Sequence, residues 1–126
     1  MFKILIIEDN NTFRYTLKDL LIERFPSMAI AEAKDEKEAL EKMEIFGPDL
    51  VFMDMQLPGS NGLRILIKHK DIFNESSIVI FTNHDSPEYK QQAIQDGADH
   101  FLSKYYSSPQ EIFHLVESIA ADQGKM

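Results

Sequence analysis

Short apolar runs and amphipathic segments alternate along the whole chain, and this alternation constrains the fold more than any other feature. Strand-like runs are expected at residues 2–7, 28–33, 49–54, 77–82 and 99–103. Each is followed by a segment whose apolar residues recur at helical spacing. Such alternation with short connections predicts a parallel sheet with helices on both faces and right-handed crossovers. The expected fold class is therefore α/β and doubly wound, with five helices.

The strand order follows from which runs are most continuously apolar. The first, third and fourth runs are almost free of polar residues before their ends, as in Leu50–Met53. Strands in the centre of a parallel sheet are buried on both faces, so their sequences are continuous apolar runs. The second and fifth runs are mixed, so we expect them at the edges. Counted along the chain, the order 2-1-3-4-5 satisfies this, which is a flavodoxin-like five-stranded sheet.

Capping signals bound the expected helices. The expected N-terminal caps are Asn10 or Asn11, Asp35, Ser60, Ser86 and Ser108. Proline follows the last two of these directly, where the first helical position tolerates it. Glycine is expected to end the second helix at Gly47 and the fourth at Gly97.

Length and charge narrow the functional classes. The 126 residues, 44% of them hydrophobic, suffice for one domain, expected to span residues 1–126. The net charge of -8 argues against direct binding to nucleic acid or to an anionic membrane. The chain has no cysteine, which fits a reducing compartment. Its first apolar run is too short for a signal peptide or a membrane span, so we expect a soluble cytoplasmic protein.

Polar residues stand where the expected strands end. Glu8 and Asp9 end the first run, Asp54 ends the third, and Thr82 ends the fourth. Lys104 follows the fifth. These ends meet at one edge of a parallel sheet, where ligands bind. Several carboxylates suit a hard ion that keeps waters, which describes Mg²⁺ better than Zn²⁺. Asp54, alone on the middle strand, is the candidate nucleophile. The Thr82 hydroxyl and the Lys104 ammonium could bind the phosphoryl oxygens.

The spacing of these residues resembles the receiver domain of two-component response regulators, with its chemotaxis-type, CheY-like fold, over essentially the whole chain. The matching pattern is Glu8-Asp9, Asp54-x-x-x-Pro58-x-x-x-Gly62, Thr82 and Phe101-x-x-Lys104. The resemblance implies a phosphorelay protein rather than an enzyme. It would take a phosphoryl group onto Asp54 from a histidine kinase or a histidine phosphotransfer protein.

The resemblance also implies a metal site. Asp9, Asp54 and the backbone carbonyl of Gln56 would ligate Mg²⁺, and Glu8 would act through a bound water.

A switch is implied as well. Thr82 would turn toward the phosphoryl group, Lys104 would pair with it, and Phe101 would move inward with Thr82. The fourth helix, fifth strand and fifth helix would then present the surface that an effector or an output domain reads. A dimer that depends on phosphorylation is left open.

Three positions depart from the pattern. Tyr105 follows Lys104 where most receivers have proline. Phe101 lacks the hydroxyl of a tyrosine at the switch position. Asn83 follows Thr82 where a small residue is usual, and we expect it to narrow access to the phosphoryl group and set its lifetime. A base at His84 is the competing hypothesis for hydrolysis.

Two other functions stay open. A Mg²⁺-dependent phosphohydrolase with an aspartyl-phosphate intermediate generally has a second acid two residues after the nucleophile, and Gln56 stands there instead. A receiver-shaped interaction module that takes no phosphate is disfavoured because the acidic set is intact. The sequence does not identify the kinase, the output or whether the chain is part of a larger regulator.

Overall fold

A computed structural model describes residues 1–83 and 86–125 of the chain. The main sheet consists of β1 (Lys3–Ile7), β2 (Ala29–Ala33), β3 (Leu50–Met53), β6 (Ser77–Thr82) and β7 (His100–Ser103). All neighbouring strands are parallel, in the order β2-β1-β3-β6-β7. Counted without the small pair β4 (Gln56–Leu57) and β5 (Ser60–Asn61), this is the order 2-1-3-4-5. The flavodoxin-like prediction is confirmed.

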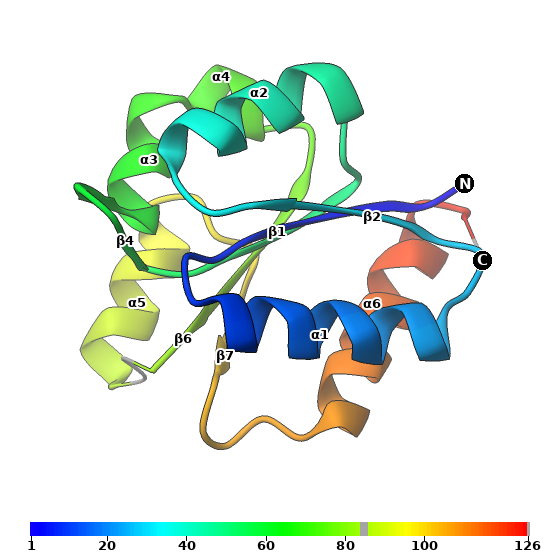
Figure 1. Cartoon of the computed structure of the whole chain (residues 1–126). Helices are drawn as coiled ribbons and strands as arrows, with labels where there is room; N and C mark the ends of the chain where they lie inside the picture. Colours follow the sequence, from blue (N-terminus) through cyan, green and yellow to red (C-terminus); the bar gives the residue numbers. More distant parts are fainter. Residues whose placement is uncertain (84–85, 126) are drawn as a thin grey trace.

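Helices cover both faces of the sheet (Figure 1). The helices within the described ranges are α1 (Asn11–Arg24), α2 (Glu36–Phe46), α3 (Gly62–Lys68), α4 (Lys70–Phe73), α5 (Pro87–Gln95) and α6 (Pro109–Asp122). Side chains of α1 and α6 share one buried cluster, and side chains of α2 to α5 share the other. Alternate strand residues divide between them: Ile4 and Ile6 face α1 and α6, whereas Leu5 and Ile7 face the opposite layer.

The third expected helix differs from the prediction. It is divided into α3 and α4 at His69, whose φ of -120° and ψ of 41° leave the helical region. The His69 ring makes a tertiary contact, with Nε2 3.0 Å from Glu36 Oε2 on α2. The cap of α3 is Asn61 rather than Ser60, because Ser60 pairs with Leu57 in the β4–β5 hairpin.

The other N-terminal capping predictions are confirmed, with Asn10 as the cap of α1, whereas α5 ends at Gln95 with Asp96 as its C-terminal cap, one residue before the expected Gly97. The side chains of Asn10, Asp35, Ser86 and Ser108 each accept a backbone hydrogen bond from the first turn of the helix that follows. Gly47 ends α2 with a φ of 61°, in the left-handed region that glycine tolerates.

Both ends of the described chain lie at the edge of the sheet where the strands begin (Figure 1). Asp49 joins them: its carboxylate accepts the backbone N–H of Lys3 at 2.8 Å and the ammonium of Lys125 at 2.9 Å. The polar residues of the site lie on the opposite side of the domain, at the C-terminal ends of the strands. None of the helices in residues 1–83 and 86–125 is long and apolar enough to cross a membrane.

Candidate functional site

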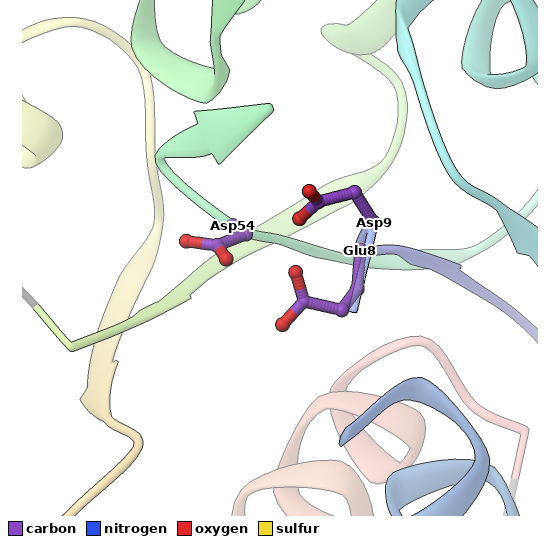
Figure 2. A group of neighbouring side chains, drawn as sticks. All are labelled: Glu8, Asp9 and Asp54. Atoms are coloured by element: carbon purple, nitrogen blue, oxygen red, sulfur yellow. The ribbon is translucent and has the colours of Figure 1, made fainter. Parts of the chain in front are cut away.

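Three carboxylates converge at the C-terminal ends of two neighbouring strands. Glu8 and Asp9 follow β1 directly, and Asp54 follows β3, which pairs with β1. Figure 2 shows Glu8 and Asp9 leaving the end of β1 beside Asp54. One oxygen from each carboxylate lies within 4.8 Å of the others. The sequence-predicted convergence is therefore present in the structure.

An open cavity of about 360 Å³ lies over these carboxylates. Its lining consists of Glu8, Asp9, Asn10, Asp54, Gln56, Leu57, Pro58, Asn83 and Lys104. Thr82 lies next to it at the end of β6, fully buried, and its carbonyl accepts the backbone N–H of Lys104 at 2.9 Å. Phe101 is half-buried on β7 and packs against the cluster beneath α2 to α5. His84 lies outside the described residues.

Lys104 carries a positive charge into the acidic cluster. Its ammonium donates a hydrogen bond to Asp54 Oδ2 at 2.8 Å and another to Glu8 Oε1. Its side chain is only 10% exposed. Burial by itself lowers the pKa of Lys104, but the bonds to Asp54 and Glu8 outweigh this and raise it. Lys104 is therefore an ammonium group at neutral pH.

Glu8 is the most deeply buried of the three acids. Burial, followed by the neighbouring Asp54 carboxyl, raises the pKa of Glu8 from 4.5 to about 8. Its Oε2 is buried and has no hydrogen-bond partner in the described part of the chain. An orphaned buried oxygen beside two further carboxylates is a donor set that a hard divalent cation satisfies.

The loop after β3 holds Asp54 in place. Asp54 Oδ1 accepts the backbone N–H of Gln56 at 3.1 Å, and Gly62 donates its N–H to Met55 O at 2.7 Å. A Cβ atom at Gly62 would lie 2.3 Å from the backbone oxygen of Asp54. Only glycine allows this approach, which is a physical reason for the glycine in the motif.

Two residues next to the site were missed in the sequence analysis. Arg14 is buried, and its guanidinium donates to the backbone oxygen of Glu8 at 2.7 Å. Lys104 Nζ lies 4.3 Å from the centroid of the Phe13 ring. The signal for Arg14 was its spacing: it shares the inward face of α1 with Leu17 and Leu21, three and seven residues later.

Comparisons with known proteins agree with this geometry. The family model of the response regulator receiver domain matches residues 4–117. The nitrate/nitrite response regulator protein NarL of Escherichia coli K12 is 29% identical over 120 residues, which cover 95% of this chain and 55% of NarL. The chain thus spans about half the length of this relative.

Solved structures show the same likeness. A LuxR-family two-component response regulator from Aurantimonas is 32% identical with a TM-score of 0.84, over 95% of this chain and 85% of that one. A response regulator protein from Burkholderia pseudomallei is 26% identical with a TM-score of 0.81, over 98% and 71%. That structure is described as containing a phosphorylated aspartic acid, a calcium ion and citrate.

Proposed function

Because the chain belongs to the response regulator receiver domain family, we propose that it is the phosphoacceptor of a two-component system and that Asp54 takes the phosphoryl group. One observation carries the proposal: Asp54 lies within 4.8 Å of two other carboxylates while its Oδ2 accepts the Lys104 ammonium at 2.8 Å. The phosphorylated aspartate and the calcium ion in the Burkholderia pseudomallei relative support it.

The phosphoryl donor is a phosphohistidine on a sensor kinase or on a histidine phosphotransfer protein. An Asp54 carboxylate oxygen forms a bond to phosphorus as the N–P bond of the donor breaks. The electron pair of that bond stays on the imidazole, which takes up a proton. Lys104, already beside Asp54, offsets the negative charge that the phosphoryl oxygens bring, and the hydroxyl of Thr82 is the second partner for them.

The residues present fit a divalent cation. Glu8, Asp9, Asp54 and the backbone carbonyl of Gln56 would hold Mg²⁺, with Glu8 acting through a water. Their oxygens are the hard ligands that this ion prefers, and none of the described residues that line the cavity carries a thiolate or an imidazole. When bound, the cation supplies positive charge that offsets the repulsion between the carboxylates and an incoming phosphoryl group.

The proposed output runs through α5, β7 and α6. Thr82 on β6 is joined to Lys104 through the backbone, and Phe101 on β7 pairs in register with Ile80 on β6. A phosphoryl group that draws Thr82 inward would thus act on β7 and move Phe101 from its half-buried position. The partner that reads this surface is an effector protein, an output domain or a second phosphorylated copy of the chain.

The proposal is for a signalling protein rather than an enzyme with turnover, catalysing only its own phosphorylation and dephosphorylation. A phosphohydrolase with an aspartyl-phosphate intermediate generally has a second acid two residues after the nucleophile. The residue two positions later, Gln56, has an exposed side chain and engages Asp54 through its backbone N–H. Residues 1–126 would act as a single receiver unit.

The test is phosphorylation by a small acyl phosphate with Mg²⁺, followed by intact mass measurement. The parent chain should gain one phosphoryl group, and Asp54→Asn should gain none. Asp71→Asn, on α4 and away from the cavity, is the matched control and should react like the parent. Equal labelling of Asp54→Asn and the parent would show that the acceptor lies elsewhere.

A further inference from the structure

Arg14 is a buried charge that the phosphoryl chemistry does not use. It is 7% exposed and makes three hydrogen bonds. Nη1 donates to the backbone oxygen of Glu8 at 2.7 Å, Nε to Glu32 Oε1 at 3.1 Å, and Nη2 to Asn11 Oδ1 at 2.7 Å. A guanidinium placed so deeply is costly unless these partners hold it, so its position is strongly determined.

Arg14 donates its hydrogen bond to the Glu8 carbonyl at the point where the hydrogen bonds between strands end. The last residue of β1 is Ile7, and the Glu8 N–H still bonds to Ala33 O at 2.9 Å. The Glu8 carbonyl lies beyond the ladder, and Arg14 supplies a donor for it. The peptide bond is planar, so fixing this carbonyl also fixes the direction in which Asp9 leaves the strand. Arg14 therefore acts on the placement of both acids without touching either carboxylate.

Glu32 anchors the other side of the guanidinium. It lies on the edge strand β2, opposite Ile6 of β1, and its second oxygen accepts the Lys18 ammonium at 2.8 Å. Glu32 does not line the acidic cavity. The contacts thus run from β2 through Arg14 to the turn that carries Glu8 and Asp9.

We propose that Arg14 and Glu32 form a clamp that positions the Glu8–Asp9 turn for a divalent cation, so that the Mg²⁺ affinity of the cavity depends on an ion pair outside it. The inference rests on the proposed function because it takes Mg²⁺ as the ligand. Arg14 and Glu32 are positioning residues, since neither would contact the ion. Outer partners of metal ligands commonly change affinity by about 10- to 100-fold.

Charge and positioning predict opposite results for one substitution. Arg14→Met removes a positive charge from the neighbourhood of a dication site, which by Coulomb's law alone would tighten Mg²⁺ binding. If Arg14 works by positioning, the same variant binds Mg²⁺ about 10-fold more weakly. Arg14→Lys keeps the charge but lacks the planar fork, so it should also bind weakly. Glu32→Gln keeps the shape of the side chain but removes the ion pair, and its decrease in Mg²⁺ affinity should be smaller than that of Arg14→Met.

The measurement is calorimetric titration of the full chain with Mg²⁺, each variant being checked for folding by circular dichroism. Arg24→Met is the matched control: it removes an arginine ion pair from the same helix, but an exposed one, to Glu117. It should bind Mg²⁺ like the parent. A second readout needs no metal: hydrogen exchange at the Asp9 and Asn10 amides should speed up in Arg14→Lys and Glu32→Gln, and not in Arg24→Met.

The outcomes separate this inference from the proposed function. Mg²⁺ affinity that is unchanged or higher in Arg14→Met, or unchanged amide exchange in Arg14→Lys, overturns the clamp and leaves the phosphoacceptor intact. A parent chain that binds Mg²⁺ with the expected loss in the Arg14 variants, but takes no phosphate onto Asp54, supports the clamp and refutes the proposed function.

Discussion

The ammonium of Lys104 lies 4.3 Å from the centroid of the Phe13 ring while it donates a hydrogen bond to Asp54. The Phe13 ring on α1 contacts one side of the ammonium, and the Asp54 carboxylate, directly after β3, accepts its hydrogen bond on another. The Phe13 ring in turn packs against the tilted ring of Phe81, the residue directly before Thr82, at a centroid distance of 5.2 Å. The position of the ammonium therefore depends on aromatic packing as well as on charge.

Replacing Phe13 should slow phosphorylation of Asp54. Phe13→Leu keeps an apolar side chain but removes the ring face that attracts the ammonium, worth about 0.5 to 2 kcal/mol. We expect a decrease of roughly 2- to 30-fold in the rate of labelling by a small acyl phosphate. Phe25→Leu is the control, because Arg24 lies over that ring at 4.9 Å, at the far end of α1. Equal decreases in both variants would mean that the effect is general destabilisation.

The stability of the metal-free domain should fall as pH rises from about 5 to 8 because of Glu8. Its pKa is raised from 4.5 to about 8 on folding. Below 4.5 the group is protonated in both states; between the two values only the folded state keeps the proton, so ionisation favours unfolding. Lys104, with its pKa raised above 10.5, does not titrate in this window.

Urea unfolding at several pH values checks this prediction. Glu8→Gln mimics the protonated acid and should lose much less stability over the same range. The difference between the two chains should reach the order of a few kcal/mol. Parallel pH profiles for Glu8→Gln and the parent would contradict the assignment.

Gly62 should be far less tolerant of substitution than Gly59. An added Cβ at Gly62 meets the Asp54 backbone oxygen at 2.3 Å, whereas at Gly59 it meets nothing within 4 Å. Gly59→Ala then costs only backbone strain, about 1 to 2 kcal/mol at a φ of 70°. Gly62→Ala should cost about 3 kcal/mol or more and displace Asp54 as well. Denaturant midpoints and Mg²⁺ affinity should both change in Gly62→Ala, and only the midpoint in Gly59→Ala.

The lifetime of the proposed acyl phosphate should depend on Asn83. This exposed residue lines the cavity beside Asp54, and its amide is not a base. Asn83→Ala should therefore speed phosphate loss by admitting water, with little dependence on pH. Decay of labelled protein after removal of the donor, followed from pH 6 to 8, tests this. A phosphoryl lifetime that is the same in Asn83→Ala and the parent, but becomes shorter as a histidine loses its proton, would favour His84 as a general base.

The sheet order and the acidic cluster could be predicted from the sequence because both depend on local patterns. The apolar runs that end in Glu8 and Asp54 define buried strands, and parallel strands bring their ends together. The position of Lys104 followed from the same rule. What these patterns could not predict is which partner each side chain takes, such as Lys104 bridging two carboxylates.

The parts that were missed depend on tertiary contacts. The division of α3 from α4 occurs at His69, which contacts Glu36, 33 positions away. Arg14 reaches Glu32 and the Glu8 carbonyl across β1 and β2. Neither contact is visible as a periodic pattern. A charge on an otherwise inward helix face was the one sign available, and it does not specify the partner.

The convergence of Glu8, Asp9 and Asp54 also acts on the resting chain. Burial, followed by the neighbouring Asp54 carboxyl, raises the pKa of Glu8, so ionising all three carboxyls in the metal-free chain is unfavourable. The three converging carboxyls thus reduce the stability of the metal-free fold, and a bound dication would offset this cost. Because a ligand of the folded state stabilises it by mass action, the melting temperature should climb with Mg²⁺ concentration.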